Sequence, residues 1–364
     1  MTSKEGYESE VKNLSRRIII ILLMIAVIFN LSACTSNKNK RYEASFLDLF
    51  DTMTTVVGYA HNKDEFTEYA RIIHDKLKEY HELYDIYHNY EGINNIKTIN
   101  DNAGVAPVKV DPKIIDLLKL SKEAGKLTGG EMNDAFGAVL SVWHQYRTEG
   151  IEDPEAAKLP PMELLKEKAK HTDIDAVIID EAASTVFLKD PEMSLDVGAI
   201  AKGYATEMVS RYAEEQGFKN GMLSVGGNVR TIGSKLGENN EEQYWNVGIQ
   251  NPDLNSKEKN LYILKLKDYS LVTSGVYERY YTVDGKQYHH IIDPDTLMPS
   301  QYYLSVSIVC KDSGMADALS TAIFNMPYEE GLKLIESLED TEALWVRKDG
   351  SMSYSSGFQE FVKE

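Results

Sequence analysis

Ser194-Leu-Asp-Val-Gly-Ala-Ile-Ala-Lys-Gly-Tyr-Ala205 is the stretch that says most about the fold of this chain. Its residue types predict a strand, a glycine turn and the start of a helix that continues over 206–215. Such a helix start directs backbone N–H groups and the Lys202 side chain toward one place, where an anionic phosphate could bind. Glycines also occur at helix starts for packing alone, so this stretch by itself leaves both interpretations open.

On either side of this stretch, helical and strand patterns are mixed, with several hairpin-like pairs of strands. This arrangement predicts an α+β fold of mixed, largely antiparallel sheets packed with helices. No strand is followed by a G-x-G-x-x-G turn, so a Rossmann dinucleotide-binding domain is not expected. The predicted strands cover 53–60, 176–179 and 185–188, and the predicted helices cover 64–87, 155–170, 312–326 and a segment that begins at Asp111-Pro112.

The composition excludes several classes of protein. The chain has 364 residues, of which 43% are hydrophobic, and a formal net charge of −18. This is a globular composition, and an acidic chain without a basic patch is not expected to bind nucleic acid. Its two cysteines, Cys34 and Cys310, cannot form the disulfide framework of a small secreted protein. Cys310 follows Ile308-Val309 and is expected to be a buried strand residue.

The N-terminus has the pattern of a secretion signal. Arg16-Arg17 precedes an apolar run over 18–29, which is shorter than the roughly 20 residues of a membrane-spanning helix. Leu31-Ser-Ala-Cys34 resembles the lipobox of bacterial lipoproteins. That resemblance implies a signal peptide over 1–33, a lipidated Cys34 with a tether over 34–42, and a folded domain over 43–364. An uncleaved signal anchor, or an ordinary signal with a chance cysteine, are the alternatives.

Three further segments carry polar residues suited to a site. Gly226-Gly227 interrupts a predicted strand and would permit a bulge or the close approach of a ligand. The Asp284-Gly285 turn predicts a hairpin that returns His289 and His290 toward the level of Thr273 and Ser274. By contrast, His74, His81 and His88 lie seven residues apart, a spacing at which they would form a polar helical stripe rather than bind one metal ion.

The predicted helix 312–326 places Asp317 and Thr321 four residues apart and therefore on one face. A carboxylate and a hydroxyl are hard ligands suited to Mg²⁺, which keeps waters and substrate phosphates as its other ligands. A simple hydrogen bond between the two side chains is the alternative interpretation.

Together these segments resemble the ApbE family, the FAD:protein FMN transferases. The resemblance covers about 46–354 and is carried by five motifs in the family's order, to which the lipobox adds. The motifs are DVGAIAKGYA at 196–205, VGGN at 225–228, TSGVYER at 273–279, HIIDP at 290–294 and ADALSTA at 316–322.

The resemblance implies a role for each of several residues. Mg²⁺ would be held by the Ala199 carbonyl and the side chains of Asp317 and Thr321. His290 and Asp317 would be catalytic, with His290 as base or charge stabiliser. FAD would contact Met53, Lys202 and the backbone around Ile291, and also Asn95, Ile96, Lys97 and Asn133.

Two regions depart from the family's pattern. Asn94-Asn-Ile-Lys-Thr-Ile-Asn100 replaces a Ser-Glu-[Ile/Leu]-Ser-Arg-[Ile/Leu]-Asn stretch, and Asn133 replaces the usual aspartate in Met132-Asn-Asp-Ala-Phe-Gly137. An amide at 133 can still form hydrogen bonds with an adenine edge, but it adds no charge.

The expected reaction is Mg²⁺-dependent transfer of FMN from FAD to a Thr or Ser hydroxyl of a partner flavoprotein, which releases AMP. The expected partner is an acceptor flavoprotein of membrane electron transfer, and the expected location is the cell membrane, lipid-anchored and facing outside the cytoplasm. The alternatives are an FAD pyrophosphatase, in which water is the acceptor, and a lipoprotein that binds flavin without chemistry.

Overall fold

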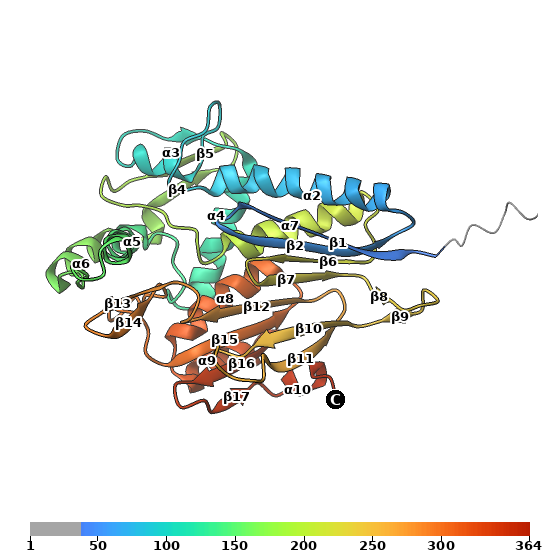
Figure 1. The fold of residues 1–364 in the computed structure, drawn as a ribbon. Helices are drawn as coiled ribbons and strands as arrows, with labels where there is room; N and C mark the ends of the chain where they lie inside the picture. The colour runs from blue at the N-terminus through green and yellow to red at the C-terminus, as the bar shows by residue number, and fades with distance from the viewer. Residues whose placement is uncertain (1–37) are drawn as a thin grey trace, which may run out of the picture.

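The computed structural model describes residues 38–364, and its centre is an eight-stranded sheet (Figure 1). Every neighbouring pair in this sheet is antiparallel, so the predicted mixed, largely antiparallel fold is confirmed. The strand order is β1 (Lys40–Leu49), β2 (Thr52–Ala60), β6 (Gly221–Val225), β7 (Asn228–Ile232), β12 (Ser270–Gly275), β15 (Tyr303–Cys310), β16 (Glu342–Arg347) and β17 (Met352–Tyr354).

Smaller sheets and nine helices surround the main sheet in the described part of the chain. The smaller strands are β3 (Val108–Lys109), β4 (Val177–Asp180), β5 (Thr185–Leu188), β8 (Lys235–Leu236), β9 (Glu242–Gln243), β10 (Trp245–Gln250), β11 (Asn260–Leu266), β13 (Tyr280–Val283) and β14 (Lys286–His289). The helices are α2 (Lys63–Tyr84), α3 (Ile96–Asp101), α4 (Pro112–Leu127), α5 (Gly137–Glu152), α6 (Met162–Lys168), α7 (Ala201–Glu215), α8 (Ser313–Asn325), α9 (Tyr328–Glu336) and α10 (Phe358–Phe361).

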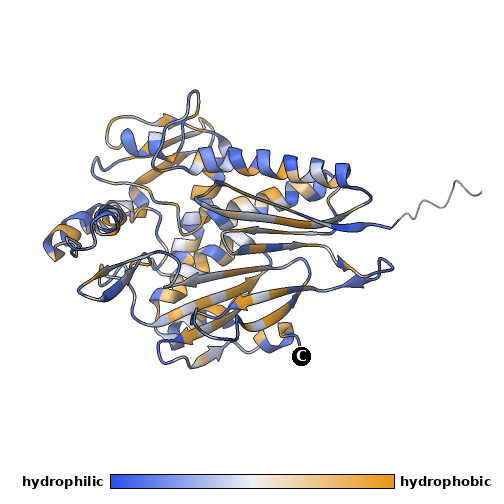
Figure 2. Cartoon of the chain, in the orientation of Figure 1, coloured by the Kyte–Doolittle hydropathy of each residue, from blue (hydrophilic) through white to orange (hydrophobic). Residues whose placement is uncertain are grey.

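The main sheet is covered on both faces because its strands carry apolar side chains on both faces. Val56 and Ile308 belong to the core under α2, α4, α7 and α8, whereas Val57 and Val309 face β10, β11 and α10. Successive side chains of a strand point to opposite faces, so these adjacent pairs require a cover on each side. Figure 2 shows the result, with apolar colour concentrated on the central strands and polar colour on the outer turns of α2.

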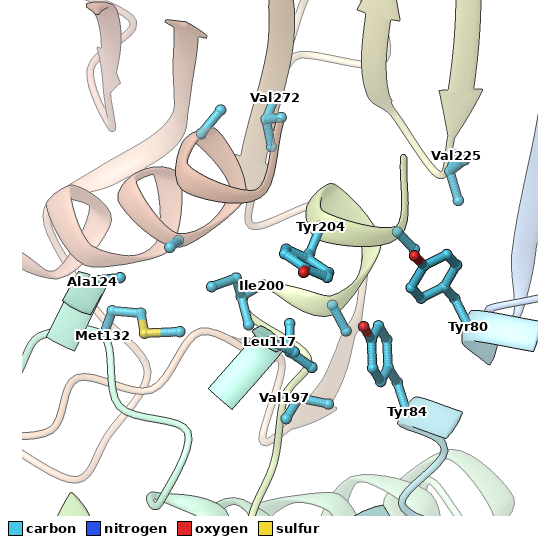
Figure 3. Packing of buried hydrophobic residues seen from close by; sticks show 14 of the residues in the cluster. Tyr80, Tyr84, Leu117, Ala124, Met132, Val197, Ile200, Tyr204, Val225 and Val272 are labelled. Atoms are coloured by element: carbon cyan, nitrogen blue, oxygen red, sulfur yellow. The ribbon is translucent and has the colours of Figure 1, made fainter. Parts of the chain in front are cut away.

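The core beneath the helices is anchored by tyrosines and by the central motif (Figure 3). Tyr204 of α7 packs against Tyr80 and Tyr84 of α2, with ring centroids 6.4 and 6.3 Å apart. Ile200 and Val197 from the loop before α7 are buried in the same cluster. Apolar contacts with this cluster therefore hold one side of the loop, and its polar groups lie on the other side.

Three local predictions were wrong, each for a physical reason. The segment before α7 is not a strand: it makes only an isolated bridge between Ser194 and Phe136, and its Leu195 N–H donates to the Asn100 side chain (2.8 Å). Gly226-Gly227 does not interrupt a strand but forms the turn between β6 and β7, with both residues at positive φ. The helix predicted over 155–170 begins only at Met162, because Pro160-Pro161 directly precede it.

Other predictions agree with the structure. Asp111 and Asp312 are the N-caps of α4 and α8, and the Asp284-Gly285 turn joins β13 to β14. Cys310 lies buried at the end of β15, where burial raises the pKa of its thiol to about 11. The predicted signal peptide, Cys34 and the first part of the tether lie outside the described residues. Within 38–364, no helix combines the length and the apolar character that crossing a membrane requires.

Candidate functional site

A cavity of about 620 Å³ opens where the turns at one end of the main sheet meet α5, α7 and α8. Its walls come from segments far apart in sequence: the turn between β1 and β2, the 196–202 loop, the end of β12, the 290–294 segment and one face of α8. Gly226 and Asn228 line it too, so all five of the quoted sequence motifs contribute to a single cavity.

The wall at the start of α7 depends on the close approach of α7 to α8. The Gly203 N–H donates to Asp317 Oδ2 (2.8 Å). A Cβ at Gly203 would lie 2.2 Å from the Ser313 carbonyl oxygen, so only glycine permits this contact. Just before the helix, Asp196 Oδ1 accepts from the Gly198 N–H (2.9 Å) and closes the turn. The 196–203 motif therefore begins α7 and also provides the glycine against which α8 packs.

Helix α8 presents three polar residues to the cavity. Asp317, Thr321 and Asn325 are each four residues apart and all line it. The Ser274 hydroxyl at the end of β12 shares a hydrogen bond with the Ser320 hydroxyl (2.8 Å), which fixes this helix against the sheet.

The three predicted magnesium ligands, Ala199, Asp317 and Thr321, all line the cavity. Asp317 is 5% exposed, and burial raises the pKa of its carboxyl above the ordinary value. A carbonyl, a carboxylate and a hydroxyl form an all-oxygen donor set, which fits Mg²⁺. No cluster of three or more His, Cys, Asp or Glu side chains suited to a metal occurs among residues 38–364. Substrate phosphates and waters would have to complete the coordination.

His290 lines the same cavity with a defined tautomer. Its Nδ1 lies 3.2 Å from the Arg279 carbonyl oxygen, which can only accept, so Nδ1 carries the proton and Nε2 carries the lone pair. Burial lowers the pKa of this imidazole to about 3, and the charges of Arg279 and Lys202 lower it further. The ring is therefore neutral at physiological pH and able to take up a proton at Nε2.

Basic side chains form one wall of the cavity, which we call the basic wall: Lys202, Arg147, Arg279 and His144. Neither guanidinium makes an ion pair or a side-chain hydrogen bond to another described residue, and Lys202 Nζ has only a long contact of 3.5 Å with the Gly198 carbonyl. Burial lowers the pKa of Arg147, and the charge of Arg279 adds to this effect. The unpaired charges of Lys202, Arg147 and Arg279, gathered in a chain of net charge −18, indicate an anionic ligand.

The turn between β1 and β2 contributes a strained backbone to the cavity. Phe50 and Asp51 have φ values of 55° and 51°, a left-handed conformation that non-glycine residues adopt at a cost. The Phe50 N–H donates to His81 Nδ1 (3.2 Å), which holds the turn against α2. Met53 is 58% exposed and does not line the cavity, although Phe50 to Thr52 do.

Of the other residues predicted to contact FAD, some line the cavity and some do not. Asn133 and Ile291 line the cavity. Asn95, Ile96 and Lys97 do not, and the structure gives each another role. Asn95 is fully buried, caps α3 and donates to the Glu82 and His88 carbonyls; Ile96 is buried in the core; and Lys97 pairs with Asp101 (2.7 Å). Direct contact of this trio with FAD stays a prediction.

Several cavity residues were missed by sequence reasoning. His81 and His88 were interpreted only as a polar stripe, and Glu131, His144, Arg147 and Asn325 were not singled out at all. His144 Nδ1 lies 3.2 Å from the Tyr87 hydroxyl, and its Nε2 lies 3.7 Å from Asp196 Oδ2. The sequence did indicate Asn325, because it continues the four-residue spacing of Asp317 and Thr321 and therefore lies on the same face of the helix.

Comparisons with known proteins agree with this geometry. The chain matches the ApbE family over residues 50–345. It is 33% identical over 274 residues to a FAD:protein FMN transferase of Treponema pallidum (74% of this chain, 75% of that protein), and 32% identical over 262 residues to one of Klebsiella pneumoniae (72% and 77%). A solved ApbE protein of Thermotoga maritima superimposes with a TM-score of 0.77 at 29% identity and covers 89% of this chain and 100% of that one.

Proposed function

This chain belongs to the ApbE family of flavin transferases, and we propose that it transfers FMN from FAD onto a Thr or Ser hydroxyl of a partner flavoprotein and releases AMP. One observation carries the proposal: His290, with Nε2 unprotonated, lines the same cavity as Asp317, Thr321 and Lys202. A base, a set of oxygen donors and an unpaired cation are the groups that cleavage of a pyrophosphate requires.

The basic wall supports FAD as substrate. The pyrophosphate of FAD carries negative charge, and the guanidinium groups of Arg147 and Arg279 can bind phosphate oxygens in a bidentate manner. Lys202 adds a point charge next to the α7 N-terminus, where backbone N–H groups also favour an anion.

Mg²⁺ fits the donor set of Ala199, Asp317 and Thr321, which we propose as its ligands. When bound there, the ion would stabilise the negative charge of the pyrophosphate oxygens. The Gly203 N–H keeps one oxygen of Asp317 oriented, so that the other remains available for a ligand in the cavity.

We propose that His290 acts as the general base. The acceptor hydroxyl gives its proton to Nε2 while its oxygen forms a bond to the FMN phosphorus, and the bond from that phosphorus to the bridging oxygen breaks. AMP departs with the bridging oxygen, and FMN stays on the acceptor as a phosphoester. The hydrogen bond from Nδ1 to the Arg279 carbonyl orients the ring throughout.

We further propose that the chain is held at the cell membrane through lipid on Cys34 and faces outside the cytoplasm. The support is the lipobox together with the course of β1. This ten-residue strand runs from Lys40, near the tether, to Leu49, next to the cavity turn, a length of roughly 33 Å. The cavity thus lies at the end of β1 away from the tether. Cys34→Ala should move the protein from the membrane fraction to the soluble fraction; unchanged fractionation would contradict the anchor.

The test of the transferase is mass spectrometry after incubation of the full-length chain with FAD, Mg²⁺ and an acceptor flavoprotein of membrane electron transfer. We expect the acceptor to gain the mass of FMN, AMP to appear in equal amount, and EDTA to block both. Release of AMP and free FMN without labelling would instead favour the pyrophosphatase. Intact FAD with every acceptor would contradict both and leave a flavin-binding protein.

A further inference from the structure

A buried ion pair joins two elements that form walls of the cavity. Glu207 of α7 is 1% exposed, and its Oε2 accepts a hydrogen bond from Arg230 Nε of β7 (3.0 Å). Its Oε1 accepts from Nε of Arg211 (2.8 Å), whose side chain is 55% exposed. Neither Glu207 nor Arg230 lines the cavity, although Lys202 of α7 and Asn228 of β7 do. The pair therefore lies behind the walls of the site.

The same carboxylate also binds the first residue of α8. Glu207 Oε2 accepts from the Ser313 N–H (3.0 Å). The first N–H groups of a helix have no partner within that helix, so they are bound by side chains or by water. Ser313 is fully buried and out of reach of water. A carboxylate of α7, held in place by Arg230, therefore fixes the start of α8.

The contacts between α7 and α8 follow one register. Glu207 accepts from Ser313, and four residues earlier on α7 the Gly203 N–H donates to Asp317 (2.8 Å), four residues later on α8. The two helices therefore pass each other in antiparallel directions, and successive contacts are about 6 Å apart. Gly203 permits the close approach, but a glycine has no side chain that resists sliding of one helix along the other. The hydrogen bond at Glu207 supplies that resistance.

One more step of this register leads to the remaining proposed magnesium ligands. Ala199, four residues before Gly203, lies in the turn that precedes α7, and Thr321 lies four residues beyond Asp317; both line the cavity. Mg²⁺ requires nearly octahedral geometry, with oxygens at about 2.0–2.1 Å. A site of this kind has to be held to within about 0.5 Å by the residues around it. A small slide of α8 along α7 would therefore move two of the three donors relative to the other.

We propose that Glu207 is a positioning residue, whose carboxylate sets the register of α8 on α7 and thereby brings Asp317 and Thr321 to the Ala199 carbonyl. This inference rests on the proposed metal site. A role in stability alone predicts that loss of Glu207 lowers the unfolding temperature and leaves the binding of Mg²⁺ by the folded chain unchanged. A positioning role predicts that the folded chain binds Mg²⁺ more weakly.

The test measures the dissociation constant of Mg²⁺ by isothermal titration calorimetry on the full-length chain saturated with FAD, well below the unfolding temperature of each variant. Glu207→Ala removes all three hydrogen bonds and should raise this constant at least about tenfold, since a misplacement of about 1 Å at a site costs about a hundredfold. Glu207→Gln keeps the side-chain volume but offers one acceptor oxygen to three donors, so it should raise the constant at least about threefold. This second variant serves if Glu207→Ala fails to fold.

Leu266→Ala is the matched control for stability alone. Leu266 of β11 is fully buried in the cluster on the other face of the main sheet, away from α7 and α8. Its truncation leaves a cavity and should lower the unfolding temperature, measured by circular dichroism. The dissociation constant of Mg²⁺ should nevertheless stay within about twofold of that of the unmodified chain.

The outcomes separate this inference from the proposed function. An unchanged affinity for Mg²⁺ in the folded Glu207 variants, or an equal loss in Leu266→Ala, would overturn the positioning role alone. Failure of the unmodified chain to bind Mg²⁺ in the presence of FAD would overturn the proposed metal site, and the inference with it. Failure to bind FAD at all would overturn the proposed function itself.

Discussion

The two ends of the cavity differ in kind, although one helix contributes to both. Asp317 and Thr321 line the cavity together with the basic wall and His290, and Asn325 and Glu131 line it as well. The first group includes the unpaired charges of Lys202, Arg147 and Arg279 and suits phosphates, whereas Asn325 Oδ1 and Glu131 Oε2 are buried without partners among the described residues. The difference indicates that the phosphate chemistry depends on the first group, and variants within that group should separate binding from chemistry.

The largest effect is expected for Asp317→Asn. The amide keeps an oxygen for the Gly203 N–H but removes the only carboxylate among the proposed magnesium ligands. FMN transfer, measured as labelled acceptor by mass spectrometry, should fall at least about a thousandfold, in line with loss of a major electrostatic contribution.

Asp312→Asn is the matched control for that variant, because Asp312 caps the same helix outside the cavity and asparagine is an equally good cap. Its activity should stay close to that of the unmodified chain. Comparable losses in both variants would show that α8 is merely destabilised.

His290→Ala should separate chemistry from binding. Loss of a general base lowers kcat by about a hundredfold to ten-thousandfold. The dissociation constant of FAD, measured by calorimetry, should change less than about threefold, since the imidazole is neutral and contributes no charge. A large loss of FAD affinity with an unchanged kcat would reassign His290 to binding.

Arg147→Met should weaken binding at the basic wall while sparing the chemical step. Removal of one partly buried charge that faces a phosphate should raise the dissociation constant of FAD about tenfold, and the effect should shrink at high salt. Arg71→Met, on the exposed face of α2 where Arg71 pairs with Glu68 and Asp75, is the matched control. Equal effects of the two variants would contradict a specific role for Arg147.

The smallest effect is expected from pH. Because burial lowers the pKa of His290 to about 3, the imidazole stays unprotonated as pH falls, and kcat/KM should change less than about twofold between pH 8 and 6. A histidine with the ordinary pKa of about 6.5 would lose half of its activity near pH 6.5. If kcat/KM falls to half near pH 6.5, the pKa of the His290 imidazole is the ordinary one and the prediction is wrong.

The phosphate end was largely predictable from sequence, because its residues sit in short motifs with regular spacing. The i, i+4 relation of Asp317 and Thr321, and the hairpin turn that delivers His290, both follow from local rules. The antiparallel α+β architecture followed from the mixture of strand and helix patterns.

Other cavity residues were not predictable in the same way. Glu131 precedes the Met132–Gly137 stretch, and the charges of Asp293 and Asp295 that act on it come from a distant segment. Arg147 and His144 are ordinary polar residues of α5 until tertiary contacts bring them beside Lys202. The strand predicted before α7 does not form because the segment makes only an isolated bridge with Phe136, and the Asn100 side chain, 95 residues away, accepts the Leu195 N–H.

The most direct test of this division is a crystal structure of the chain with FAD and Mg²⁺. We predict the two phosphorus atoms between Lys202 and the Asp317–Thr321 face of α8. Phosphates remote from Asp317 would contradict the account.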